Sequence, residues 1–406
     1  MKKTLIAVAA AAALTATSAF AEITFGAWLR VITGVGSNGE DVVMGTTNSW
    51  GGVRPARLNA AGTSEDGKAG FKLDFYFEND EIWGHDKNIR IGDNGYLWVK
   101  PIDQIQLSIG KFDGGETGFR GDFCYGSWNW LRPYNWIVED EGLTFRGSHK
   151  DGLMARITPI DNLVVLVQLP VMNAKWGGNN AGYVAKTETE DAKNTAADVF
   201  KNAAYMASYS IEGVGTLKAG FFGADEEKTV EGKKYNQTGT VNVAFDLNAI
   251  ENLYVTVGAF FDIADKEMGE WHEKMKFTAG ASYQVSDAMK FSVSGGYVKY
   301  MDKCAWLGNK DNAFQIGAGV DYVIMDGLTL NADVRYKNVG YGKKGDDGSV
   351  SFLAGVVKSV GGNASLQAGF QGSTNGCGLV QADTGIPAVE NDDFVWAIPV
   401  GLSVWF

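Results

Sequence analysis

Cysteine, histidine and proline are all scarce in this chain, and each scarcity excludes a class of protein. The 406 residues include 3 cysteines, 3 histidines and 7 prolines. Three cysteines cannot build the disulfide framework of a cysteine-stabilised scaffold. The histidines at 85, 149 and 272 show no metal-type spacing to cysteines or acids, so we expect neither a metal nor a cofactor. Low proline together with 12% aromatic residues excludes a largely disordered chain.

Long apolar runs and excess positive charge are also lacking. After residue 21 no stretch of 18 uninterrupted apolar residues occurs, so the sequence predicts no transmembrane helix. The formal net charge is -12, and loss of Lys2 and Lys3 with an N-terminal segment would make it -12 - 2 = -14. Negative charge does not favour the phosphates of DNA or RNA, so nucleic acid is not an expected partner.

The first 21 residues have the pattern of a secretory signal peptide. A positive start at residues 1–3 precedes an apolar run at residues 5–14 and the motif Ala-Phe-Ala at residues 19–21. This combination indicates export and cleavage, and the run is shorter than the roughly 20 residues that a membrane anchor needs. We predict cleavage between Ala21 and Glu22, which leaves one mature domain over residues 22–406.

Along the rest of the chain, apolar and polar residues alternate with a period of two. In "AGFKLDFYF" (residues 69–77), the apolar residues alternate with Lys72, Asp74 and Tyr76. A strand places alternate side chains on opposite faces, so this segment is predicted to be a strand with one apolar face. The same pattern recurs in "TVNVAFDL", "NLYVTVGAFFD", "KMKFTAGASYQV" and "GLTLNADVRYK".

The connections between these strands alternate in length, which predicts an up-and-down antiparallel meander. Short connections include "EGVG" near residue 212 and "MDG" near residue 325. The only helical pattern, "ETEDAKNTAADVF" (residues 188–200), predicts one or two helical turns within a loop. Longer polar segments are predicted to be loops near residues 34–52, 173–200, 225–236, 264–272, 302–311, 339–348 and 374–392.

Strand length decides between a soluble β-sandwich and a membrane barrel. Sandwich strands average nearer 5–6 residues, whereas the alternating runs here reach about 9–13, enough to cross a bilayer at a tilt. Only a closed barrel pairs every backbone polar group inside a membrane. The predicted fold is therefore an all-β transmembrane antiparallel up-and-down β-barrel of about 16–18 strands. A barrel of this width leaves an aqueous channel unless something plugs it.

Residues 112–141, "FDGGETGFRGDFCYGSWNWLRPYNWIVEDE", stand out as a long segment rich in glycine and aromatic residues. The segment follows the fifth predicted strand, "QIQLSIGKF". Tyr and Trp suit sites where one end is apolar and the other is wet. The residues alone leave three roles open: the segment narrows the lumen, plugs the barrel from inside, or lines a stacking track for sugars.

In architecture the mature chain resembles the Gram-negative porin family, through its signal peptide, alternating strands, loop position and terminal Phe. In that family the long loop after the fifth strand folds into the barrel, and its acids face basic residues on the wall. This chain has "GGETGFRGDF" where the family commonly has Pro-Glu-Phe-Gly-Gly-Asp. The resemblance implies a pore constriction with acidic residues Glu116, Asp122, Glu139, Asp140 and Glu141. Strand parity places the basic wall residues Arg30, Arg57, Lys72, Arg146 and Arg156 on the lumen face.

The last predicted strand, "FVWAIPVGLSVWF" (residues 394–406), closes the barrel against "EITFGAWLRVIT" (residues 22–33). Pro399 gives up one ladder hydrogen bond, which predicts a local defect near this seam. Counting by twos puts one apolar face toward lipid, with aromatics near both ends. A terminal aromatic on this face resembles the assembly signal of outer-membrane proteins, here Phe394, Trp396, Leu402, Val404 and Phe406.

The predicted function is an outer-membrane porin, a passive diffusion channel for small hydrophilic solutes or ions. The alternative is a structural or adhesive surface barrel whose loops bind a partner. An enzyme is not expected, because no histidine lies in a nucleophile–base–acid motif. Expected partners are outer-membrane lipid, the barrel assembly machinery and periplasmic chaperones, with a homotrimer left open. Pairing of Cys304 with Cys377 and free thiols both remain open.

Overall fold

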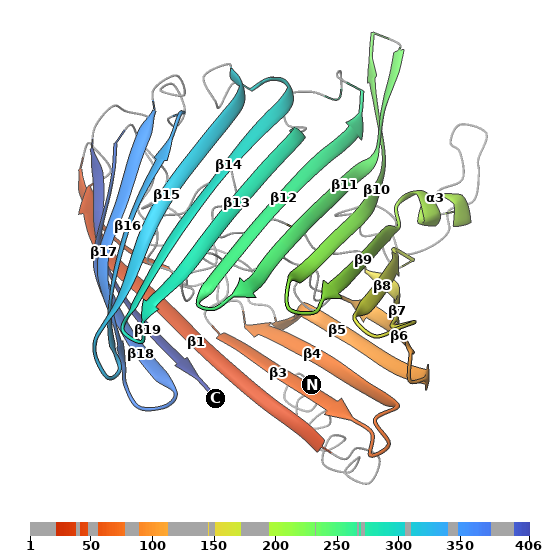
Figure 1. The fold of residues 1–406 in the computed structure, drawn as a ribbon, viewed down its shortest axis with the longest axis horizontal. Coiled ribbons are helices and arrows are strands. Elements are labelled where there is room, and N and C mark those ends of the chain that lie inside the picture. Colours follow the sequence, from red (N-terminus) through yellow and green to blue (C-terminus); the bar gives the residue numbers. More distant parts are fainter. Residues whose placement is uncertain are drawn as a thin grey trace.

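The computed structural model describes residues 22–37, 41–47, 56–77, 89–112, 145, 151–171, 195–231, 233–265, 268, 273–304, 310–339, 348–374 and 394–406. Nearly all of them lie in one antiparallel sheet that closes into a barrel (Figure 1). Its strands are β1 (Glu22–Ser37), β2 (Val42–Thr47), β3 (Ala56–Thr63), β4 (Ala69–Phe77), β5 (Ile89–Ile102), β6 (Ile105–Lys111), β7 (Gly152–Ile157), β8 (Leu163–Leu169), β9 (Ala204–Ile211), β10 (Gly215–Val230), β11 (Lys233–Ile250), β12 (Leu253–Ala264), β13 (Glu273–Ser286), β14 (Met289–Cys304), β15 (Lys310–Met325), β16 (Leu328–Lys337), β17 (Ser349–Ser359), β18 (Ala364–Ser373) and β19 (Val395–Trp405).

Nineteen strands occupy 19 - 1 = 18 positions around the barrel, because two of them share one position. On one side β1 pairs with β19. On its other side the first half of β1 pairs with β3 and the second half with β2. Each remaining strand pairs with its neighbours in sequence. The predicted barrel of about 16–18 strands and its closure by the first and last strands are confirmed.

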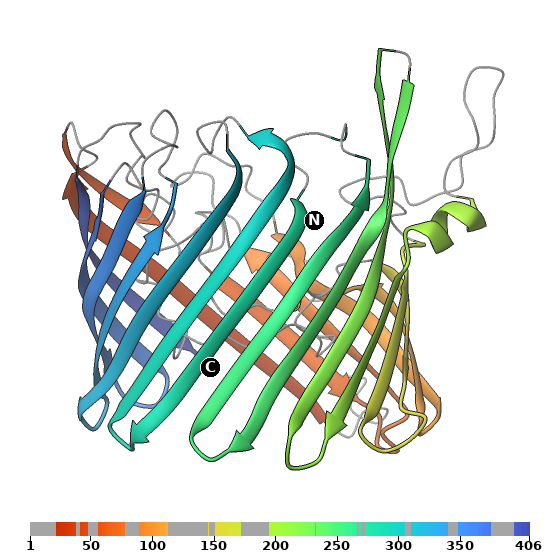
Figure 2. The ribbon, with the colours of Figure 1, turned by 45° about the horizontal axis from the view of Figure 1, so that its top comes forward.

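Two of the predicted loops are wrong. Residues 225–236 continue β10 and β11, whose ladder runs from Gly215–Leu247 to Val230–Lys233 with an irregularity after Gly223. In Figure 2 this hairpin rises well beyond the rim. Residues 34–52 hold the end of β1 and all of β2. These segments were predicted to be loops because they are polar. A strand that extends beyond the membrane meets water on both faces, so its apolar and polar residues need not alternate.

The two faces of the sheet follow the predicted alternation. In β4, Asp74 and Tyr76 are buried on the inner face, with exposed fractions of 0% and 2%. In β15, Gln315 is 3% exposed while its outward neighbours Phe314 and Ile316 are 43% and 59% exposed. An apolar outer surface suits contact with the hydrocarbon chains of lipid, and the polar residues face the interior of the barrel.

Aromatic residues form two rows on the outer face. Near the rim with the long loops, rings lie close across neighbouring strands. On β15, Phe314 and Tyr322 are eight residues apart, which at about 3.3 Å per residue and a tilt of about 40° separates the rows by about 20 Å. The ring pairs are Phe261–Phe277 at 5.7 Å, Phe314–Tyr336 at 5.9 Å, Phe352–Phe370 at 5.8 Å, Phe352–Phe394 at 6.0 Å and Phe370–Trp396 at 6.2 Å.

The seam between β1 and β19 includes the last residue of the chain. Phe406 donates a backbone hydrogen bond to Ala27 at 2.8 Å and accepts one from it at 3.0 Å. Its side chain is 78% exposed on the outer side. The predicted defect at Pro399 is also present, because the β18–β19 ladder has no pair between Ala368–Val400 and Gln371–Ala397. The seam is nevertheless continuous on the β1 side, where Gly34 pairs with Pro399.

One short helix confirms the predicted helical turns. Helix α3 (Ala196–Lys201) begins at a capping box in which Thr195 and Asp198 each accept a hydrogen bond from the other's backbone nitrogen. It leads directly into β9 at the rim. Among the described residues, no helix has the length and apolar character to cross a membrane.

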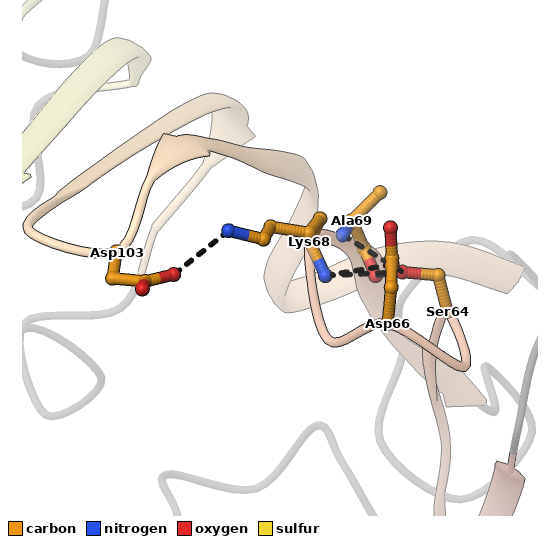
Figure 3. Close-up of polar contacts among 5 residues, drawn as sticks. All are labelled: Ser64, Asp66, Lys68, Ala69 and Asp103. Atoms are coloured by element: carbon orange, nitrogen blue, oxygen red, sulfur yellow. Dashed lines mark hydrogen bonds and ion pairs between the residues drawn. The ribbon is translucent and has the colours of Figure 1, made fainter.

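Two short turns at the opposite rim are joined by an ion pair (Figure 3). In the β3–β4 turn, the Ser64 hydroxyl donates to Asp66 at 2.6 Å, and this bond is the main cause that lowers the pKa of Asp66. Lys68 Nζ lies 2.8 Å from Asp103 Oδ1 in the β5–β6 turn. The hydrogen bond from Lys68 lowers the pKa of Asp103, and the same contact raises the pKa of Lys68.

Lys68→Met is expected to return the pKa of Asp103 to the ordinary carboxyl range. A carboxyl group whose pKa is lowered by folding stabilises the fold only while it is ionised. The contribution of this pair is therefore present at neutral pH and is lost as pH falls through the folded-state pKa of Asp103. Carboxyl NMR titration of the refolded protein measures the shift, and Lys358→Met, an exposed residue near the end of β17, is the control. An Asp103 titration that is identical in wild type and Lys68→Met would contradict the assignment.

Candidate functional site: the barrel lumen

The lumen wall at the early strands carries an anchored arginine. Arg57 of β3 forms an ion pair with Asp74 of β4, and its guanidinium lies 5.7 Å from the centre of the Tyr76 ring. Asp74 also accepts hydrogen bonds from the backbone and side-chain nitrogens of Asn94, at 3.1 and 2.9 Å. The Asp74 side chain is 0% exposed and that of Arg57 is 21% exposed. The acid is thus enclosed within the wall, while part of the arginine side chain stays accessible.

Two further basic residues share this inner face. Lys72 precedes Asp74 by two residues on β4, and Arg156 follows the buried Met154 by two residues on β7. Both side chains are half-buried, so they are more accessible than Asp74. Arg57, Lys72 and Arg156 therefore place positive charge on the inner face of β3, β4 and β7.

The later strands carry charged inner residues that the sequence interpretation did not include in the site. Lys218 Nζ of β10 lies 2.8 Å from Asp246 Oδ2 of β11, and the Thr256 hydroxyl of β12 donates to Asp246 Oδ1 at 2.7 Å. Such residues could have been identified from segments such as "KMKFTAGASYQV" and "GLTLNADVRYK", in which polar residues at alternate positions indicate the face toward the lumen. The porin resemblance directed attention to the early strands instead. The other buried inner charges of this kind are Lys276 on β13 and Asp333, Arg335 and Lys337 on β16.

One sector of the inner wall is apolar, and we call it the inner apolar patch. Phe112 packs on Tyr96 with ring centres 5.2 Å apart, and Phe145 packs edge-on against Phe222 at 5.9 Å. Gly220 fits closely here, because a Cβ atom at this position would lie 3.0 Å from side-chain atoms of both Phe145 and Met206, which would have to shift. The patch consists of Phe112, Phe145, Met154, Leu166, Ala204, Met206 and Ala244, with Tyr96, Val164 and Phe222 packed against it.

The inner apolar patch contains the two described residues that flank the long segment after β6. Phe112 and Phe145 are 1% and 0% exposed, and they are the described residues on either side of residues 113–144. The two described residues that flank that segment therefore both lie on the inner wall. Sequence reasoning missed this patch, because its members come from β5 to β11 and from no single motif.

The predicted site residues divide into two groups. Arg57, Lys72 and Arg156 lie on the inner wall, and the backbone of Arg30 pairs with Ser403 across the seam. The side chain of Arg30 lies outside the described part of the structure. Within the described residues, no group of three or more His, Cys, Asp or Glu could hold a metal ion. The residues Glu116, Asp122, Glu139, Asp140, Glu141 and Arg146 also lie outside the described ranges, so their roles stay predictions.

A family comparison accounts for this architecture. A family model described as "Gram-negative porin" matches residues 7–342. The chain belongs to the Gram-negative porin family. Porins are passive channels of the outer membrane, so the closed barrel of this porin is a diffusion channel and its lumen is the functional site.

A solved porin structure shows the same fold at low sequence identity. The anion-selective porin from Comamonas acidovorans has 14% identity and a TM-score of 0.53, with 95% of this chain and 100% of that chain covered. The outer membrane channel DcaP of Acinetobacter baumannii has 10% identity and a TM-score of 0.47, with 95% and 97% covered. No curated protein sequence matches this porin. The selectivity of its channel must therefore be argued from its own residues.

Proposed function

We propose that residues 113–144 lie within the lumen and narrow the channel for small hydrophilic solutes and ions. The supporting observation is that Phe112 and Phe145 are both buried in the inner apolar patch. The 144 - 113 + 1 = 32 residues between them are enough chain to fold across the lumen and return to the same patch. The rest of the lumen is wide enough for water in a barrel of 18 strands.

The narrowed region carries opposite charges on its two sides. On the segment, Glu116 and Asp122 are the first acidic candidates, with Glu139, Asp140 and Glu141 near its exit. On the wall, Arg57, Lys72 and Arg156 supply positive charge, with Arg30 and Arg146 as further candidates. Opposed rows of charge create a transverse field that orients polar solutes and sets ion preference, and no bond is made or broken.

The double variant Lys72→Glu and Arg156→Glu is expected to shift ion permeability toward cations. The two substitutions change the inner wall by four charge units in a confined space where screening is weak. The measurement is the reversal potential of refolded protein in planar bilayers under a salt gradient. Lys358→Glu, at an exposed position on the short-turn rim, is the matched control. An unchanged reversal potential with intact conductance would remove these residues from the selectivity filter.

We also propose how the chain is exported and assembled. Residues 1–21 act as the signal peptide, cleaved between Ala21 and Glu22, and the proposal is supported by the basic start, the apolar run and the Ala-Phe-Ala motif. The outward residues Phe394, Trp396, Leu402, Val404 and Phe406 present the assembly signal, read by the barrel assembly machinery after delivery by periplasmic chaperones. The barrel then assembles as a homotrimer. Intact mass of the purified protein tests the cleavage site.

A further inference from the structure

One tryptophan of the inner wall lies over a glycine of the neighbouring strand. Trp98 of β5 is in the inward register, where it pairs with Gly70 of β4 and with the buried Ser108 of β6. A Cβ atom at Gly70 would lie 2.5 and 2.6 Å from Cζ2 and Cε2 of the indole, so only glycine leaves room for the ring at this place. The Trp98 side chain is half-buried, so part of its ring remains open to the lumen.

Two hydrogen-bond donors at this ring are not used by the described residues. Lys100 follows Trp98 by two residues on β5, and its Nζ lies 5.3 Å from the centre of the Trp98 ring. Among the described residues, the ammonium of Lys100 forms no ion pair and the indole nitrogen of Trp98 donates no hydrogen bond. Asp103, the acid of the adjoining β5–β6 turn, pairs with Lys68 instead, at 2.8 Å (Figure 3). Donors that are partly withdrawn from water are commonly paired with an acceptor, and here a solute can supply one.

The inner wall around this ring combines apolar surface with positive charge. Tyr96, two residues before Trp98, packs on Phe112 of the inner apolar patch with ring centres 5.2 Å apart. Lys72 pairs with Tyr96 across β4 and β5, and Arg156 lies on the same inner face at β7. Lys72 is thus a diagonal neighbour of Trp98, and such neighbours lie about 7–8 Å apart, within reach of one small solute. An anion with an apolar body matches both features of this wall.

We propose that Trp98 and Lys100 form a binding site for carboxylates with an aromatic body. The carboxylate accepts hydrogen bonds from Lys100 Nζ and Trp98 Nε1, and such bonds are strengthened by the charges. The aromatic body lies along the indole and Tyr96, where contact between rings is favourable. An inorganic anion leaves the rings unused, and a neutral aromatic solute leaves the ammonium unpaired. The proposal rests on the lumen as the diffusion path and adds a class of solute to the proposed function.

The test compares benzoate with acetate as blockers of the potassium chloride current through the refolded full chain in planar bilayers. Benzoate has a carboxylate and a ring, whereas acetate has the carboxylate without the ring. Trp98→Leu removes the indole, Trp98→Phe keeps a ring without the donor, and Lys100→Met removes the charge. The matched controls Tyr254→Leu and Lys290→Met change an inward aromatic residue and an inward lysine near the same rim, on β12 and β14. For each variant the half-blocking concentration of both acids is recorded.

Benzoate is expected to block wild-type channels at a concentration several-fold lower than acetate. Trp98→Leu is expected to abolish this preference and Trp98→Phe to restore part of it, whereas Lys100→Met raises the half-blocking concentration of both acids. Both control variants are expected to behave like the wild type. Equal block of wild-type channels by the two acids, or block by neither, would overturn the proposal. An unchanged preference in Trp98→Leu channels of wild-type conductance would also overturn it.

This outcome is separate from that of the charge arrangement proposed above. The reversal potential in a salt gradient reports on Lys72 and Arg156, whereas the ratio of the two half-blocking concentrations reports on Trp98 and Lys100. Loss of the benzoate preference with normal ion selectivity would reject the carboxylate site alone. A preserved preference together with an unchanged reversal potential in the double variant would reject the charge filter alone.

Discussion

Single-channel conductance is expected to rise several-fold when residues 113–144 are replaced by a short glycine–serine linker. Phe112 and Phe145, which flank this segment, are both buried in the inner apolar patch, and the expectation rests on our proposal that the segment occupies part of the lumen cross-section. Without it, the current would be limited by the width of the 18-strand wall, which leaves an aqueous channel. Planar-bilayer recordings of refolded protein measure the change directly.

The design of this deletion keeps Phe112 and Phe145 in place, so that the inner apolar patch and the wall behind it are retained. A matched control replaces residues 341–347, between β16 and β17, with the same linker. The control barrel is expected to keep the conductance of the wild type. A segment deletion that folds to a heat-stable barrel and conducts like the wild type would show that the channel is narrowed elsewhere.

Removal of Phe406 is expected to reduce insertion into the outer membrane strongly while leaving the conductance of inserted channels unchanged. The residue contributes two backbone hydrogen bonds to Ala27 at the seam and an aromatic ring on the outer side. Its side chain is exposed on the outer side and the inner charges are on the opposite face of the sheet, so transport through a completed barrel is not expected to depend on it. The amount of folded barrel in membrane fractions, compared with total protein, measures insertion.

Substitutions at the same position separate the two contributions of Phe406. Phe406→Trp keeps an aromatic ring and both backbone hydrogen bonds, so it is expected to insert like the wild type. Phe406→Ala keeps only the backbone bonds and is expected to show the larger part of the defect. Normal insertion of the chain that lacks Phe406 would refute the role of this residue in assembly. A changed conductance of the inserted channels would show that Phe406 also affects transport.

Alternation of side chains was sufficient to predict most of the barrel. In β4, β13 and β16, apolar residues alternate with polar ones, and the structure places them on the outer and inner faces as expected. The same parity is the basis on which Arg57, Lys72 and Arg156 were predicted to face the lumen. Parity is reliable here because lipid and water lie on opposite faces of one sheet, and a shift by one residue would reverse both faces.

Parity could not predict features that arise between distant strands. In β8, "LVVLVQL", inward Leu166 and outward Val167 are both apolar, so the segment gives no signal that its inner face joins the inner apolar patch. The sharing of one position by β2 and β3 depends on which half of β1 each strand meets. Neither feature has a local pattern, because both depend on contacts between residues far apart in sequence.

The seam between β1 and β19 has a consequence for the order of folding. Its first pair, Trp28 and Trp405, joins positions 405 - 28 = 377 residues apart, whereas most other ladders join consecutive strands. Contacts of such separation form late and slowly. Until then the sheet is an open ribbon, and β1 and β19 expose unpaired backbone along two edges that can pair with another chain. The time before the seam forms is therefore when this porin is most prone to aggregate, and when a chaperone that shields an edge would raise its yield most.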